Sequence, residues 1–223
     1  MKGKAKMRIG ENNATGSGLA IFETMESRRL LSGYEVTPFE QYMVELLNRT
    51  RANPVAEASL HGIDLNEGLT PGTLGTQARQ PLAVNADLTQ AVRDHIQWLL
   101  DNDAFSHTGA GGSSPHARMG SAGYDFTNGA GSGENLSVRM STGSKSITTN
   151  EIDRHHANLF IDSSVAGRGH RLSMLADNFR EVGSGAVLGS GFQYSGNTWN
   201  AVMTGQNFAY NHNNGGDSFL TGV

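Results

Sequence analysis

The sequence contains no cysteine among its 223 residues. A disulfide framework, a thiolate zinc site and a cysteine nucleophile are therefore excluded. The fold must rest on burial of apolar side chains, and 37% hydrophobic residues suffice for one core in a chain of this length. Size favours a single domain with tails over two domains. The lack of cysteine does not by itself distinguish the cytoplasm from the exterior.

Long apolar runs and positive charge are also scarce. No stretch approaches the ~18 apolar residues that a membrane-spanning helix needs. The net charge is -4, and the longest basic run is Arg28-Arg29. Such a chain has no long-range attraction to phosphate backbones or anionic membranes, so we expect no nucleic-acid partner.

Several short catalytic and binding motifs are missing as well. The sequence has no phosphate-binding glycine loop, no G-x-S-x-G nucleophile elbow and no H-E-x-x-H zinc helix. Residues 211–217 lack the acids that an EF-hand loop needs, which argues against calcium there. Any metal site must therefore be assembled by tertiary packing.

The two ends of the chain have compositions unlike the middle. The first ten residues are basic, but the apolar stretch 19–22 is too short for an ordinary secretion signal. Residues 22–32 are similar to a short segment found ahead of many large extracellular bacterial proteins, which implies export; an amphipathic leader is the alternative. We expect a leader over 1–35, a folded domain over 36–210 and a linker to a further module over 211–223.

Helical periodicity dominates the first two thirds of the chain. Apolar residues at i, i+3, i+4, i+7 and i+8 predict a helix from Pro38 that ends before Pro54. The strongest periodic pattern predicts a second helix over 87–100, and a third is expected from Asn150, whose side chain can cap it. Shorter helical stretches are expected at 115–119 and after Gly169, with a loop over 61–82.

Strand patterns come later in the chain. They predict strands over 134–140, 181–188 and 199–207, of which the last two form an antiparallel hairpin across a turn-rich segment. Helices first and strands late indicate an α+β fold.

Three short motifs, in this order, resemble the signature of the CAP superfamily of cysteine-rich secretory, antigen 5 and pathogenesis-related proteins. They are Phe105-Ser106-His107-Thr108, Gly133-Glu134-Asn135-Leu136 and Gly167-Arg168-Gly169-His170-Arg171. The opening helix 46–54 and the closing strand 206–208 are similar to the family too. The resemblance implies a bacterial-type domain, a three-layer α-β-α sandwich with a central antiparallel sheet, and an open cleft that holds two histidines and two acids.

The resemblance assigns three cleft residues directly, namely His107, Glu134 and His170. The fourth position departs from the family. The family often has the string Trp-aromatic-x-Glu here, and this chain has Leu159-Phe160-Ile161-Asp162. Asp162 would be a shortened acid of the cleft. The alternative is that Asp162 only ends the helix and caps the next turn.

Other polar residues near the motifs have structural interpretations. His155 lies ~20° from Asp162 on the helical wheel and is the best candidate to support the cleft from behind. Ser106 suits a turn, although a nucleophilic arrangement of Ser106, His170 and Glu134 stays open. His95, on an apolar stripe, is expected to be a hydrogen-bonded core residue. The remaining residues in this group are expected on the surface or in structural roles: His116, His156, His212, Arg118 and Arg171.

Imidazoles and carboxylates of this kind suit zinc or another divalent first-row metal, with His107 and His170 as the ligands. The leading hypothesis is an extracellular or surface-associated protein that binds a metal ion, a small ligand, a protein or a wall component without turning it over. The alternative is a peptidase-like hydrolase in which His107, Glu134 and His170 are catalytic and Glu134 acts as base.

Overall fold

The computed structural model describes residues 35–127 and 130–211. The expected leader, the expected linker and His212 lie outside the described residues, apart from their boundary positions. The described part forms helices α1 (Pro38–Ala52), α2 (Pro54–Leu60), α3 (Ala86–Asp101), α4 (Pro115–Ser121), α5 (Thr149–Ile161) and α6 (Gly169–Met174), a 3-10 turn at Ala110–Gly112, and strands β1 (Ala83–Val84), β2 (Ala130–Ser141), β3 (Glu181–Tyr194) and β4 (Asn197–Asn211).

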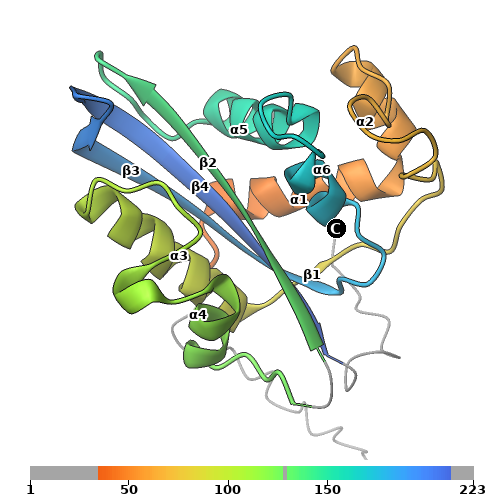
Figure 1. Cartoon of the computed structure of the whole chain (residues 1–223), viewed down its shortest axis with the longest axis horizontal. Helices are drawn as coiled ribbons and strands as arrows, with labels where there is room; N and C mark the ends of the chain where they lie inside the picture. Colours follow the sequence, from red (N-terminus) through yellow and green to blue (C-terminus); the bar gives the residue numbers. More distant parts are fainter. Residues whose placement is uncertain (1–34, 128–129, 212–223) are drawn as a thin grey trace, which may run out of the picture. The chain divides into compact units, whose positions relative to one another are not determined.

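The helices lie in two layers on either side of one sheet. Figure 1 shows α1, α5 and α6 on one face and α3 with α4 on the other, and the contacts between elements agree. The α-β-α sandwich expected from the motifs is confirmed. None of the helices in the described residues is long and apolar enough to cross a membrane.

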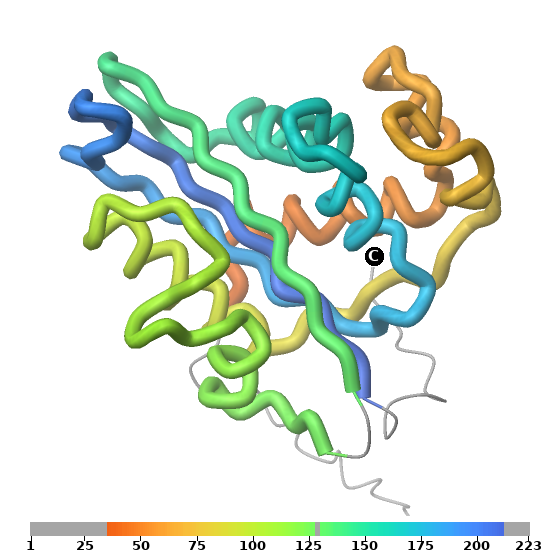
Figure 2. The backbone as a smooth tube through the Cα atoms, in the orientation of Figure 1, coloured from red at the N-terminus to blue at the C-terminus, as the bar shows by residue number. Residues whose placement is uncertain are grey.

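The sheet has the strand order β1-β3-β4-β2. The hairpin of β3 and β4 forms its centre, and β2 pairs antiparallel with β4 over its whole length as an edge strand (Figure 2). The strands extend beyond the predicted ranges. The two-residue strand β1, which lies between the expected loop 61–82 and α3, was not predicted and adds a parallel pair with β3.

Local sequence explains where the main helices begin. Thr37 and Glu40 form a capping box at the start of α1, and the Asn85 side chain accepts a hydrogen bond from Leu88 N at the start of α3. The predicted helices are confirmed within a few residues. Helix α5 is capped by Thr148, whose side chain accepts from Glu151 N, and not by Asn150 as expected. Helix α2, which starts at Pro54 shortly after α1 ends, was not predicted from the sequence.

Glycines let α3 lie unusually close to the sheet. A Cβ atom on Gly183 of β3 would come within 2.1 Å of the backbone of Leu88, and one on Gly205 of β4 within 2.3 Å of Val92. The close approach buries the apolar face of α3 completely, including Val92, Ile96 and Leu99. The sheet is thereby held against the loop that follows α3, where the first motif histidine lies.

Candidate functional site

Glu134 on β2 is the centre of a buried ionic cluster. Its Oε1 atom lies 2.8 Å from Nδ1 of His107, and its Oε2 atom accepts a hydrogen bond of 2.7 Å from Nη2 of Arg118 on α4. The Glu134 side chain is 1% exposed, whereas that of His107 is 53% exposed. His107 therefore covers the carboxylate and presents its own outer edge to solvent.

The partners of His107 determine which ring nitrogen is free. A carboxylate that also receives Arg118 accepts hydrogen bonds, so in the neutral ring the proton lies on Nδ1. The Nε2 atom of His107 then carries a lone pair. An imidazole in this state can bind a metal ion or accept a hydrogen bond.

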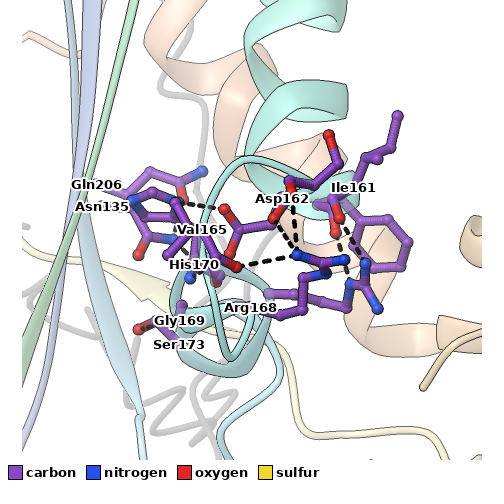
Figure 3. Close-up of polar contacts among 12 residues, drawn as sticks. Asn135, Ile161, Asp162, Val165, Arg168, Gly169, His170, Ser173 and Gln206 are labelled. Carbon is purple, nitrogen blue, oxygen red and sulfur yellow. Dashed lines mark hydrogen bonds and ion pairs between the residues drawn. The ribbon is translucent and has the colours of Figure 1, made fainter. Parts of the chain in front are cut away.

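His170 repeats this arrangement with a different acid. Its Nδ1 atom lies 2.8 Å from Oδ1 of Asp162, and its backbone N–H donates to Oδ2 of the same carboxylate at 2.9 Å. Figure 3 shows the Asp162 carboxylate pointing toward His170, whose backbone carbonyl accepts a hydrogen bond of 3.2 Å from Nδ2 of Asn135. The carboxylate again places the proton on Nδ1 and leaves Nε2 of His170 as the free nitrogen.

Asp162 ends a helix and also contacts His170. It ends α5 in a left-handed conformation with φ 54°, and its N–H bonds the carbonyl of Asn158. Its side chain, in a residue 2% exposed, reaches forward to the first turn of α6 and to the His170 ring. An aspartate at this point thus joins two helices and orients the imidazole.

The two histidine–carboxylate pairs both border edge strand β2, on opposite faces of the sheet. Glu134 contacts the α4 side of the sheet, while its neighbour Asn135 donates to the carbonyl of His170 on the α6 side. This alternation is the geometry of a strand. A pocket of about 390 Å³ follows the strand here, and its lining includes Phe105, Ser137, Asp162 and His170.

The remaining expected cleft residues have supporting contacts. Nδ1 of His155 lies 2.8 Å from Oγ of Ser137, which lines that pocket, so His155 supports the pocket from behind. Burial lowers the pKa of His155 to about 3, which keeps the ring neutral. Ser106 has the turn role: its Oγ accepts from Thr108 N.

His95 is the hydrogen-bonded core residue that its position on the apolar stripe predicts. It is 1% exposed, and its Nε2 atom donates to the carbonyl of Ser106 at 3.0 Å. Burial lowers its pKa, partly offset by Glu134 3.9 Å away. His95 therefore anchors the loop that carries His107.

Arg118 and Arg171, which were expected on the surface or in structural roles, have different sets of contacts. Arg118 pairs with Glu134 and also donates to the carbonyls of His107 and Ser113. Arg171 is fully buried, and all of its described hydrogen bonds go to backbone carbonyl oxygens. These carbonyls belong to Phe160 and Ile161 at the end of α5 and to Leu65 and Glu67. The guanidinium of Arg171 thus satisfies a helix end that would otherwise be buried without partners.

A second polar cluster, on the α1–α5 side, escaped the sequence analysis. Glu57, His61 and His156 each offer a ligand atom within 4.8 Å of the other two, the one such group of three or more acids and histidines in residues 35–127 and 130–211. His156 was expected to be structural, and it is 5% exposed. The i, i+4 spacing of Glu57 and His61 was the available signal, but it has meaning only on a helix, and α2 was not predicted.

The site residues fall into two kinds by what they can do chemically. His107 and His170 have oriented rings with free Nε2 atoms, which suit a divalent metal or a hydrogen-bond donor on a ligand. The carboxylate oxygens of Glu134 and Asp162 already accept hydrogen bonds from those rings, from Arg118 and from a backbone N–H. The structure brings each histidine to its acid and brings both pairs to β2.

Comparison with solved structures finds similar chains at low sequence identity. They include an outer surface protein from Borrelia burgdorferi, with 14% identity over 80% of this chain and 98% of that chain and a TM-score of 0.44. An extracellular protein containing an SCP domain from Bacillus anthracis str. Ames has 18% identity over 78% of this chain, a TM-score of 0.41 and only 44% of its own length covered. NaASP2 with Zn²⁺ has 13% identity over 77% of this chain and 80% of that chain, with a TM-score of 0.44.

A search of curated proteins gives no match. Among sequence models of protein families, the one described as "CAP: Cysteine-rich secretory protein family" matches residues 44–210. That range contains all three motifs and most of both helical layers and the sheet. The chain therefore belongs to the CAP family.

Proposed function

We propose that this CAP protein binds a divalent metal ion of the zinc type through the Nε2 atoms of His107 and His170. The observation that carries the proposal is the repeated pair: each ring is held by a carboxylate 2.8 Å from its Nδ1 atom. Histidine ligands of protein-bound metals usually donate their other N–H to a carboxylate or carbonyl, which orients the ring and raises its basicity. Two such rings next to edge strand β2 are oriented for metal binding.

In this proposal the two acids orient the rings and do not bind the metal. Glu134 has both oxygens engaged, by His107 and Arg118, and its side chain is buried. A general base needs an oxygen that can reach a water or substrate proton. The ion pairs of Glu134 thus count against the hydrolase alternative and favour binding without turnover.

The groove beside β2 supplies the space for a ligand. It holds about 390 Å³ and is lined by both polar and apolar residues, including Phe105 and Ser164. A divalent ion with two protein ligands keeps open positions that water or an oxygen atom of a small ligand can fill. We propose that such a ligand, free or as part of a wall component, lies in this groove.

We also propose that the protein acts outside the cell or at its surface. The description of the family as secretory supports this location, as does the similarity of residues 22–32 to a segment found ahead of extracellular bacterial proteins. Cell fractionation with an antibody to the chain tests it. Recovery of the protein from the cytoplasm alone would contradict it.

Zinc titration of the full chain by calorimetry tests the metal proposal. We expect His107→Ala and His170→Ala each to weaken the binding at this site by at least about tenfold, since even the loss of a group that only orients a ligand costs about 10–100-fold. His116→Ala is the matched control, because that exposed ring bonds Ser132 and no carboxylate.

Two results would contradict the proposal. If zinc binds the wild type and both variants equally, neither ring is a ligand. If only one of the two variants loses affinity, the histidines do not share an ion.

A further inference from the structure

A separate group of side chains between α1, α2 and α5 has the composition of a metal site. Glu57 lies on α2, His61 follows directly at its C-terminus, and His156 projects from α5. Oε1 of Glu57 is 3.1 Å from Nε2 of His61 and 3.0 Å from Nε2 of His156. Three donor atoms from two distant segments therefore converge on one point.

These distances are close to those of a bound ion. Zinc lies 2.0–2.2 Å from histidine nitrogen and carboxylate oxygen, so neighbouring ligand atoms of a tetrahedral site are roughly 3.3 Å apart. The two distances from the Glu57 carboxylate differ from that spacing by a few tenths of an ångström. The distance between the ligand atoms of His61 and His156 is within 4.8 Å. Small rotations of the rings would suffice to admit an ion.

We infer that Glu57, His61 and His156 form a second divalent-metal site, with one coordination position left for water. Two imidazoles and one carboxylate are a ligand set that zinc uses when one position stays open. In the structure Nε2 of each ring faces the Glu57 carboxylate, so each neutral ring holds its proton there. On binding, that proton would move to Nδ1 through solvent and the Nε2 lone pair would go to the metal, so no net proton is released.

The neighbours of the cluster determine how an ion would enter. The side chains of Glu57 and His156 are 2% and 5% exposed, while that of His61 is 15% exposed and provides the route from solvent. Burial alone would raise the pKa of Glu57, but bonds from His156 and Arg49 outweigh it and lower the pKa to about 2.

Arg49 competes directly with the metal. Its Nη2 atom lies 2.8 Å from Oε1 of Glu57, the oxygen that would bind the ion, and its Nε atom lies 2.9 Å from Oε2. The Arg49 side chain is 50% exposed, so its Nη2 end can turn to solvent. The Nε contact to Oε2 would then hold the carboxylate in place. The cluster thus has an internal cation that an external one must displace.

The experiment uses the full chain with His107→Ala and His170→Ala as background, which removes the ligands of the groove site. Cobalt(II) is the probe, because its visible absorption reports four-coordinate binding, and calorimetry with zinc gives the affinity. We expect one equivalent to bind in this background. Adding His61→Ala should weaken binding at least about tenfold, because it removes a direct ligand. Adding Arg49→Gln should tighten it, because the competing charge is gone.

The opposite signs of these two effects separate a metal site from a cluster that only stabilises the fold. If His61→Ala fails to fold, paramagnetic broadening of the His61 and His156 ring signals by cobalt in the background protein tests the same contact. Absence of binding in the background, or binding that ignores both His61→Ala and Arg49→Gln, overturns the inference. The groove site is tested separately, by comparing the zinc affinity of the wild type with that of the background protein.

Discussion

At the scale of single residues, the groove depends on side chains that do two things at once. Asp162 shows this best: its backbone ends α5 in a left-handed conformation, and both of its oxygens bind His170. Asparagine and aspartate tolerate that conformation better than other non-glycine residues do. A glutamate, which the family often has here, would bring a longer side chain to the same ring.

Asp162→Asn should separate the two tasks. We expect the free energy of unfolding to fall by no more than about 1 kcal/mol, because asparagine keeps the left-handed conformation and one acceptor. Zinc affinity of the groove site should fall about 10–100-fold, because the ring loses its carboxylate. Calorimetry and urea unfolding give the two values, with the exposed Asp94→Asn on α3 as control. Unchanged zinc affinity would show that the carboxylate does not orient the ring.

At the scale of elements, the contact of α3 with the sheet positions the first histidine. Gly183, Gly185 and Gly205 have no side chains between the sheet and α3, so the helix backbone itself approaches the strands. The helix then buries His95, and His95 holds the loop of Ser106 and His107 over Glu134. The packing of α3 therefore fixes the position of His107 through the His95 side chain.

Gly183→Ala tests this close packing. The new Cβ atom would lie 2.1 Å from the Leu88 carbonyl carbon and 2.2 Å from Thr89 N, so α3 must move. We expect the free energy of unfolding to fall by about 1–3 kcal/mol or more, as for other overpacked cores. Urea unfolding measures it. Gly75→Ala is the matched control, since a Cβ atom there meets nothing within 4 Å. Equal stability of the two variants would mean that α3 can shift without cost.

At the scale of the whole molecule, buried polar links join elements that are far apart in the sequence. Glu181, at the start of β3, accepts from Tyr124 in the loop after α4 and from Asn85 at the start of α3. Burial, followed by the hydrogen bond to Glu181, raises the pKa of Tyr124. This tyrosine should therefore keep its proton as long as the chain stays folded.

That pKa shift predicts a loss of stability in alkali. Below the unfolded value of about 10, folded and unfolded chains both hold the Tyr124 proton. Above it the unfolded chain releases the proton first, so the free energy of unfolding falls by up to about 1.4 kcal/mol per pH unit from this group. Tyr124→Phe should be less stable near neutrality, because Glu181 loses a donor, and should decline less steeply in alkali.

Urea unfolding at about pH 8 and about pH 11 measures the difference between wild type and variant. The exposed Tyr194→Phe serves as control. An alkaline decline of the same slope in the wild type and in Tyr124→Phe would contradict the assignment. Tyrosinate absorbance that appears only with unfolding would support it.

The sequence by itself determined the fold class, the main helices and the order of the motifs. Periodicity over 87–100 and the capping residue Asn85 are local signals, because a helix is built from contacts three and four residues apart. The motif resemblance identified His107, Glu134 and His170 by type. It also suggested Asp162 in spite of its departure from the family.

Only the tertiary structure decided how these side chains are paired. Three contacts have no local signal in the sequence. Arg118 bonds Glu134, Ser137 bonds His155, and Glu57 bonds His156, which is 99 positions away along the chain. The strand β1 was missed for the same reason, since two residues carry no periodic pattern. Helix α2 does have local signals, because the Asn53 side chain caps it and Pro54 stands at its first position, but Pro54 was interpreted only as the end of the helix before it. The sequence shows which residues are histidines. Which of the two ring nitrogens is free to bind a ligand depends on which acid the fold places beside the other ring nitrogen.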